Sequence, residues 1–123
     1  MALPHAQPLD IIDVRPLGPG LHDAVTTSLL KTPSLQLMRL VLAAGEGLPE
    51  HSVSGAITVH CLEGEALVTT PSRTCRLGAG RLVMLVGGEP HAVRAVTDAS
   101  LLVTVLLHTT SQSAQPPTTE SDP

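Results

Sequence analysis

The sequence contains no Phe, Tyr or Trp, and their absence excludes several kinds of functional site. Without aromatic side chains the chain cannot stack bases as single-strand and RNA-recognition modules do. It cannot form an aromatic cage for a quaternary ammonium group, and it has no tyrosine to act as acid or nucleophile. Asparagine is absent as well, so the chain has no N-glycosylation acceptor.

Positive charge and cysteine are sparse. Seven Lys and Arg residues face eleven Asp and Glu residues, so we expect no nucleic-acid partner. The longest apolar run, residues 101–107, is too short to cross a bilayer, and we expect no membrane partner. The N-terminus lacks the basic and apolar regions of a signal peptide. With only two cysteines, Cys61 and Cys75, both expected to be reduced, the sequence predicts a soluble cytoplasmic protein.

The apolar residues that are present are aliphatic: 20 Leu, 12 Val and 12 Ala in a chain of 123 residues. This length predicts one domain with a real core. The two ends differ from the middle in composition. We expect an N-terminal arm over residues 1–20, a folded domain over 21–108, and a disordered polar tail over 109–123.

Short apolar segments alternate with Gly, Pro and Ser, which is typical of strands rather than helices. The predicted strands are residues 35–42, 56–62, 66–70, 74–77, 81–86, 91–96 and 101–107. Only residues 21–31 could hold a short helix. Strands at this spacing predict an all-β sandwich or barrel.

Glycines and histidines recur at a spacing that identifies a known pattern. Gly45, His51 and Gly64 fit the motif G-x5-H-x-H-x3-E-x6-G, and Gly80, Gly88 and His91 fit G-x5-P-x-G-x2-H-x3-N. These two motifs resemble those of the cupin superfamily, in particular its small single-domain, RmlC-like members. The resemblance covers about residues 35–107. It implies a double-stranded β-helix, the jelly-roll barrel of cupins, in one domain of about ten strands.

The chain departs from this pattern at the positions that hold metal in the family. Metal-binding cupins use three histidines and a glutamate, and two of these four positions are Val53 and Ile57 here. His51 and His91 are the remaining candidate ligands. A catalytic zinc usually keeps three protein ligands, so two imidazoles predict at most a weak site. The cofactor stays open between none and one weakly held divalent ion, either Zn, Ni, Mn or Fe.

Strand alternation predicts which side chains line the pocket. Ile57 and Cys61 share a face, and His60 points to the other face. We therefore expect a pocket bounded by Met38, Val53, Ile57 and Cys61. Cys61 could be a soft ligand, although packing as a small hydrophobe is favoured. His60 is expected to be partly buried at a sheet–sheet or subunit interface, which is favoured over metal binding. Arg39 and Arg94 are each expected to meet a carboxylate or an interface.

Two functions from different classes remain after these steps. The first is a non-catalytic or weakly metal-loaded protein that binds an unidentified small molecule at His51 and His91. The second is a metal-dependent cupin enzyme, similar to dioxygenases or isomerases, that uses the same two histidines as ligands. The strands at residues 35–42 and 101–107 are apolar on both faces, so we also expect a second subunit to cover one face and form a homodimer.

Overall fold

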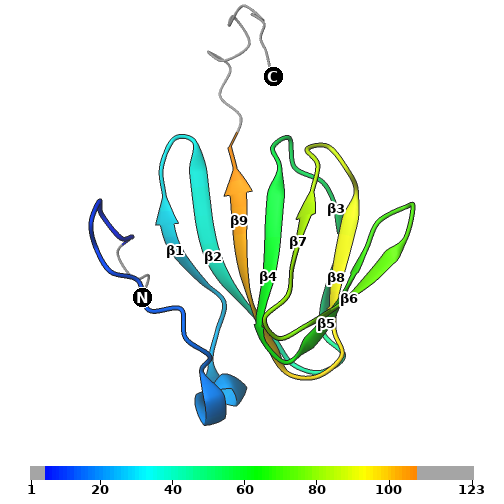
Figure 1. The fold of residues 1–123 in the computed structure, drawn as a ribbon, viewed down its shortest axis with the longest axis horizontal. Helices are drawn as coiled ribbons and strands as arrows, with labels where there is room; N and C mark the ends of the chain where they lie inside the picture. The colour runs from blue at the N-terminus through cyan, green and yellow to red at the C-terminus, as the bar shows by residue number, and fades with distance from the viewer. Residues whose placement is uncertain (1–4, 108–123) are drawn as a thin grey trace, which may run out of the picture.

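The computed structural model describes residues 5–107, which form two antiparallel sheets packed face to face (Figure 1). The five-stranded sheet has the order β1 (Thr27–Lys31), β2 (Leu35–Leu42), β9 (Ala99–Leu106), β4 (Ile57–Glu63) and β7 (Leu82–Leu85). The four-stranded sheet has the order β3 (Gly47–His51), β8 (His91–Ala95), β5 (Glu65–Thr69) and β6 (Thr74–Gly78). The all-β, single-domain jelly roll is thus confirmed. No helix within the described residues is long and apolar enough to cross a membrane.

All seven strands expected from the sequence are present, with ends that differ by at most two residues. Two further strands, β1 and β3, bring the total within the described residues to nine. Residues 21–31, the one segment considered able to hold a short helix, are divided between a 3-10 helix, η1 (Gly18–Asp23), and β1. Pairing of β1 with β2 supplies backbone hydrogen bonds that outweigh the helix propensity of leucine. The expected tail over 109–123, and His108 before it, lie outside the described residues.

The core lies between the sheets and consists of inward-facing residues from β2 and from β4 to β9. In β4, the buried side chains of Ile57, Val59 and Cys61 alternate with half-buried ones that face away. The remaining buried apolar residues are Leu40, Leu42, Ala66, Val68, Leu77, Leu85, Val93, Ala95, Ala99 and Leu101. This alternation matches the one predicted for β4 from its sequence.

Burial falls from one end of the sandwich to the other. Ala99, Leu101 and Cys61 are fully buried at the end where the strands converge in Figure 1. Further along β9, Val103 and Val105 are only partly buried, although they point to the same side as Leu101. Because small and branched side chains fill this second end incompletely, a cavity remains there.

A polar cluster attaches the N-terminal arm to the five-stranded sheet. The Arg39 guanidinium donates hydrogen bonds to the carbonyls of Arg15 (3.0 Å) and Asp13 (3.3 Å). The Glu63 carboxylate accepts from the backbone N–H of Leu17 at 2.7 Å and of Gly18 at 3.0 Å. A carboxylate or an interface was expected at Arg39, and within the described residues its guanidinium meets backbone carbonyls of the arm.

The Ser100 hydroxyl, fully buried, donates to Glu63 at 2.7 Å. Burial by itself raises the pKa of Glu63. The hydrogen bonds from Leu17, Ser100 and Gly18 favour the ionised form more strongly, so the pKa lies below its usual 4.5. A carboxyl whose pKa is lower in the folded chain than in the unfolded one stabilises the fold at pH values above its ordinary pKa. This contribution is lost as the pH falls through the lowered pKa.

Replacing Glu63 by glutamine should therefore destabilise the chain by about 1–2 kcal/mol at neutral pH, because charge-assisted hydrogen bonds become neutral ones. Urea unfolding at a series of pH values measures this. The variant should also lose less stability than the wild type between about pH 5 and pH 3. Glu50→Gln, at an exposed position in β3, is the control. Equal pH slopes for wild type and Glu63→Gln would contradict the assigned role of Glu63.

Candidate functional site

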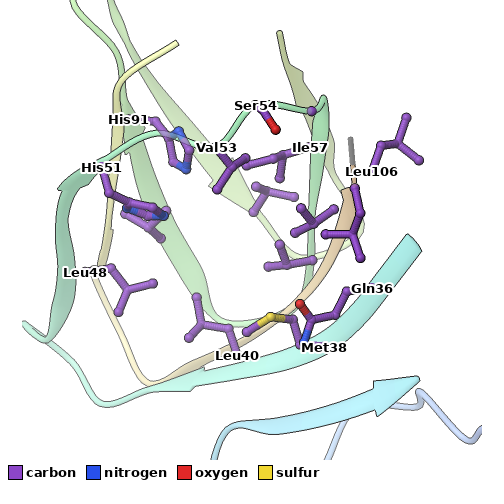
Figure 2. A pocket seen from close by; sticks show the side chains of 16 residues that line it. Gln36, Met38, Leu40, Leu48, His51, Val53, Ser54, Ile57, His91 and Leu106 are labelled. Carbon is purple, nitrogen blue, oxygen red and sulfur yellow. The ribbon is translucent and has the colours of Figure 1, made fainter. Parts of the chain in front are cut away.

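A cavity of about 290 Å³ lies between the sheets at the incompletely filled end (Figure 2). Its apolar lining consists of Met38, Leu40, Leu48, Val53, Ile57, Val59, Val93, Val103, Val105, Leu106 and Leu107. The polar residues at its wall are Gln36, Ser54, His51 and His91, with Gly55 at the loop. Of the described residues that line it, none is Asp, Glu, Lys or Arg, so the cavity holds no permanent charge.

The structure brings most of the site residues predicted from the sequence to this cavity. Met38 reaches it from β2, Val53 from the loop after β3, and Ile57 from the start of β4 (Figure 2). His51 and His91 reach it from the paired strands β3 and β8. Five side chains from three parts of the sequence, residues 38, 51–57 and 91, therefore share one cavity wall or rim.

Cys61 is the exception, because it does not line the cavity. It points inward as predicted, but it lies two inward positions beyond Ile57, at the converging end, where it is fully buried. Its Sγ lies 3.4 Å from the carbonyl oxygens of Glu63 and of Gly64, as a donating thiol would. Burial raises the pKa of the Cys61 thiol, which favours the neutral, inert form.

The two histidines face each other across the β3–β8 pair, where they are direct register partners. Their ring centroids are 4.4 Å apart and the ring planes are inclined at 57°. His91 is buried, with 4% of its surface exposed, whereas His51 is exposed at the rim. One imidazole thus lies inside the cavity and the other at its mouth.

Both rings are held in the same way by the backbone. Nδ1 of His51 lies 3.1 Å from the carbonyl oxygen of Pro49, and Nδ1 of His91 lies 3.0 Å from that of Glu89. A carbonyl oxygen can only accept, so each Nδ1 carries the proton and donates it. The neutral ring then has its lone pair on Nε2, at the end of the ring away from the main chain. Figure 2 shows both rings directed into the cavity.

Comparison with known proteins agrees with the motif spacing. A family model for the cupin domain matches residues 38–107, which contain both motifs and most of the cavity wall. The chain belongs to the cupin family. Among curated proteins, none matches this cupin.

Several solved structures resemble this cupin over most of its length. A conserved protein of unknown function from Streptococcus pyogenes is 22% identical, with 89% of this chain and 96% of that one covered, at a TM-score of 0.69. A cupin superfamily protein from Desulfitobacterium hafniense is 21% identical, with 84% and 100% covered, at 0.70. An RmlC-like cupin from Shewanella frigidimarina is 17% identical, with 70% and 78% covered, at 0.63. At these identities the likeness concerns the fold.

In this cupin, the residues present do not fit the metal site that the family pattern implies. Val53 and Ile57 occupy the two other ligand positions, and their hydrocarbon side chains line the cavity beside the histidines. Within residues 5–107, no group of three or more His, Cys, Asp or Glu side chains is arranged to hold a metal ion. A catalytic zinc normally keeps three protein ligands, and a divalent ion next to hydrocarbon would be poorly solvated.

Other residues of this cupin lie away from the cavity. His60 is half-buried on the outer face of the five-stranded sheet, between Leu82 of β7 and Leu102 of β9. Arg94 is exposed on β8. Both positions agree with the side-chain parity of their strands.

The cavity also contains residues that sequence reasoning did not place there. Leu48 was missed because Gly47 and Pro49 hid the strand β3, which is an exposed edge strand where proline is tolerated. Val103 and Val105 were assigned to a strand without an assigned face. The sequence did contain a pattern that could have assigned them, because both valines alternate with Thr104, the polar residue of the predicted strand 101–107.

Proposed function

We propose that this cupin binds a small, mainly aliphatic molecule in the cavity beside His51 and His91, without metal-dependent catalysis. The observation that carries the proposal is the replacement of two family ligand positions by Val53 and Ile57, both of which line the cavity. Such a wall favours an apolar ligand, because each 1 Å² of apolar surface removed from water contributes roughly 25 cal/mol. The absence of a permanent charge in the described lining supports the same conclusion.

The alternative is a metal-dependent cupin enzyme, dioxygenase- or isomerase-like, with His51 and His91 as ligands. One observation favours it: each Nδ1 donates to a backbone carbonyl, as metal-binding histidines commonly do. The same hydrogen bonds, however, would orient imidazoles that accept a hydrogen bond from an organic ligand. Because two histidines are fewer than the three protein ligands that a catalytic zinc usually keeps, we favour the first function.

Elemental analysis separates these two functions. The chain is purified without chelator or histidine tag, and its content of Zn, Ni, Mn and Fe is measured beside that of the His51→Leu/His91→Leu double variant. We expect well under one metal ion per chain, and no shift of the unfolding temperature when EDTA is added. Near-stoichiometric metal that disappears in the double variant would establish the alternative.

We also propose that a second copy of the chain covers the outer face of the five-stranded sheet. On this face Leu82 and Met84 of β7 are 58% and 60% exposed, and half-buried Leu102 and His60 lie beside them. Contiguous apolar surface on a sheet is typical of an interface. A homodimer would bury His60 at its centre.

We also propose a cytoplasmic location, which is supported by the two unpaired thiols, Cys61 and Cys75.

Light scattering at micromolar concentration tests the homodimer. We expect a mass of twice 12.8 kDa for the wild type and a mass near 12.8 kDa for Leu82→Glu/Met84→Glu, because four buried carboxylates would oppose association. Thr69→Glu, at an exposed position in the four-stranded sheet, should leave the mass unchanged. A wild-type mass near 12.8 kDa would refute the homodimer.

A further inference from the structure

We infer that the ligand of this cavity is an uncharged aliphatic molecule whose head group donates a hydrogen bond, such as an alcohol or a primary amide. The inference rests on the proposed function and adds the polarity of the head group. It follows from the tautomer of the two neutral imidazoles, in which Nδ1 donates to a backbone carbonyl.

The first step concerns what the histidines offer. Nδ1 of each ring donates to a carbonyl oxygen, at 3.1 Å for His51 and 3.0 Å for His91. The neutral rings consequently present only acceptors, the two Nε2 lone pairs, to the cavity. A ligand group that can only accept, such as an ether, ketone or ester, finds no donor at the two imidazoles, so that only the Ser54 hydroxyl and the Gln36 amide of the lining could bind it. A hydroxyl or an amide N–H satisfies the buried Nε2 acceptor of His91, for which residues 5–107 supply no hydrogen-bond partner.

The second step concerns charge. Of the described residues that line the cavity, none is Asp, Glu, Lys or Arg, so neither an ammonium nor a carboxylate finds a permanent counter-charge. An unpaired ion in such surroundings is costly. A carboxylate would in addition point its lone pairs at those of the two Nε2 atoms. Both ions are therefore disfavoured relative to a neutral donor.

The third step concerns size. The cavity holds about 290 Å³, roughly twice the volume of the engineered apolar cavity that accommodates one benzene molecule. A chain of roughly six to ten carbons therefore fits. The cavity wall also contains Val103, Val105 and Ile57, which suit an aliphatic tail.

Four probes with one chain length test the inference: 1-hexanol, its isomer methyl pentyl ether, hexanoate and hexylammonium. Binding is measured by calorimetry at pH 8, above the ordinary titration range of imidazole. Hexanol and the ether contain the same atoms, but only hexanol can donate. We expect hexanol to bind about tenfold more tightly than the ether, the effect of one hydrogen bond to a buried acceptor, and also more tightly than either ion.

The variants assign this preference to the two rings. In His51→Leu/His91→Leu, hexanol and the ether should bind equally, with the ether at least as tightly as in the wild type. His60→Leu makes the same substitution on the outer face and should keep the preference. Because His91 is buried, folding of the variants is checked by circular dichroism. His51→Leu alone, at an exposed position, should reduce the preference severalfold.

Each remaining result counts against the inference. If the wild type binds hexanol and the ether equally, the head-group assignment is wrong while the apolar cavity of the proposed function stands. Tightest binding of hexanoate or hexylammonium would replace the neutral head group by a charged one. If none of the four probes binds at millimolar concentration, both the inference and the proposed function are refuted.

Discussion

Replacing Leu101 by alanine is expected to destabilise the chain by about 3–4 kcal/mol, a large fraction of the stability of a small domain. Leu101 is fully buried in β9 and lies in register with Leu40 of β2 and Cys61 of β4. Both neighbours are held by sheet hydrogen bonds on either side, so the site cannot collapse to fill the space. Loss of transferred hydrocarbon and the residual cavity then both contribute.

Urea unfolding measures this loss, and the next residue provides the control. Leu102 points to the outer face and is half-buried, so Leu102→Ala should cost about 1 kcal/mol. The two variants remove the same atoms from adjacent positions of one strand. Equal losses would contradict the inward and outward alternation of β9, and with it the cavity wall formed by Val103 and Val105.

Replacing Gly64 by alanine is expected to have a comparable effect, about 3–5 kcal/mol, for two separate reasons. Gly64 connects β4 to β5 with a φ of +82°, which L residues rarely adopt. A Cβ at this position would also lie 2.1 Å from the Asp98 carbonyl oxygen and 2.8 Å from the Cα of Ala99. These are backbone atoms of the neighbouring turn and cannot move independently.

Gly80→Ala separates the two reasons. Gly80 has a φ of +84°, but no heavy atom lies within 4 Å of an added Cβ. Only the conformational term remains, and we expect a loss of about 1–2 kcal/mol. Thermal unfolding of both variants gives the comparison. If Gly80→Ala loses as much as Gly64→Ala, the close contact between the two turns does not contribute.

The strands and the motif residues could be predicted from the sequence because they depend on local patterns. The alternation in β4 correctly predicted that Ile57 points inward and His60 outward. The motif spacing from Gly45 identified His51, which does line the cavity. Strand β3 was missed because its pairing with β8 is decided by distant residues and its own composition is unfavourable. The depth of Cys61 was equally beyond a two-residue period, which gives a side but no distance along the barrel.

The polar anchor of the arm shows a second limit. Glu63 has the sequence environment of a turn, and it does form the end of β4 beside one. Its contacts with Leu17 and Ser100, 46 and 37 residues away, come from tertiary folding alone. The same holds for the tautomers of His51 and His91, which depend on backbone carbonyls whose direction no sequence pattern specifies.

The central claim is that a small aliphatic molecule occupies the cavity between the sheets, and methyl NMR tests it most directly. The chain has only three Ile and three Met residues, so a sample with ¹³C-labelled Ile and Met methyl groups gives a simple spectrum. Ile57 and Met38 line the cavity, whereas Met84 and Ile11 are exposed elsewhere, at 60% and 97%. On titration with 1-hexanol, we predict saturable shifts of Ile57 and Met38 with Met84 and Ile11 unchanged. Shifts confined to Met84 and Ile11, or no saturable shift of Ile57 and Met38, would contradict the claim.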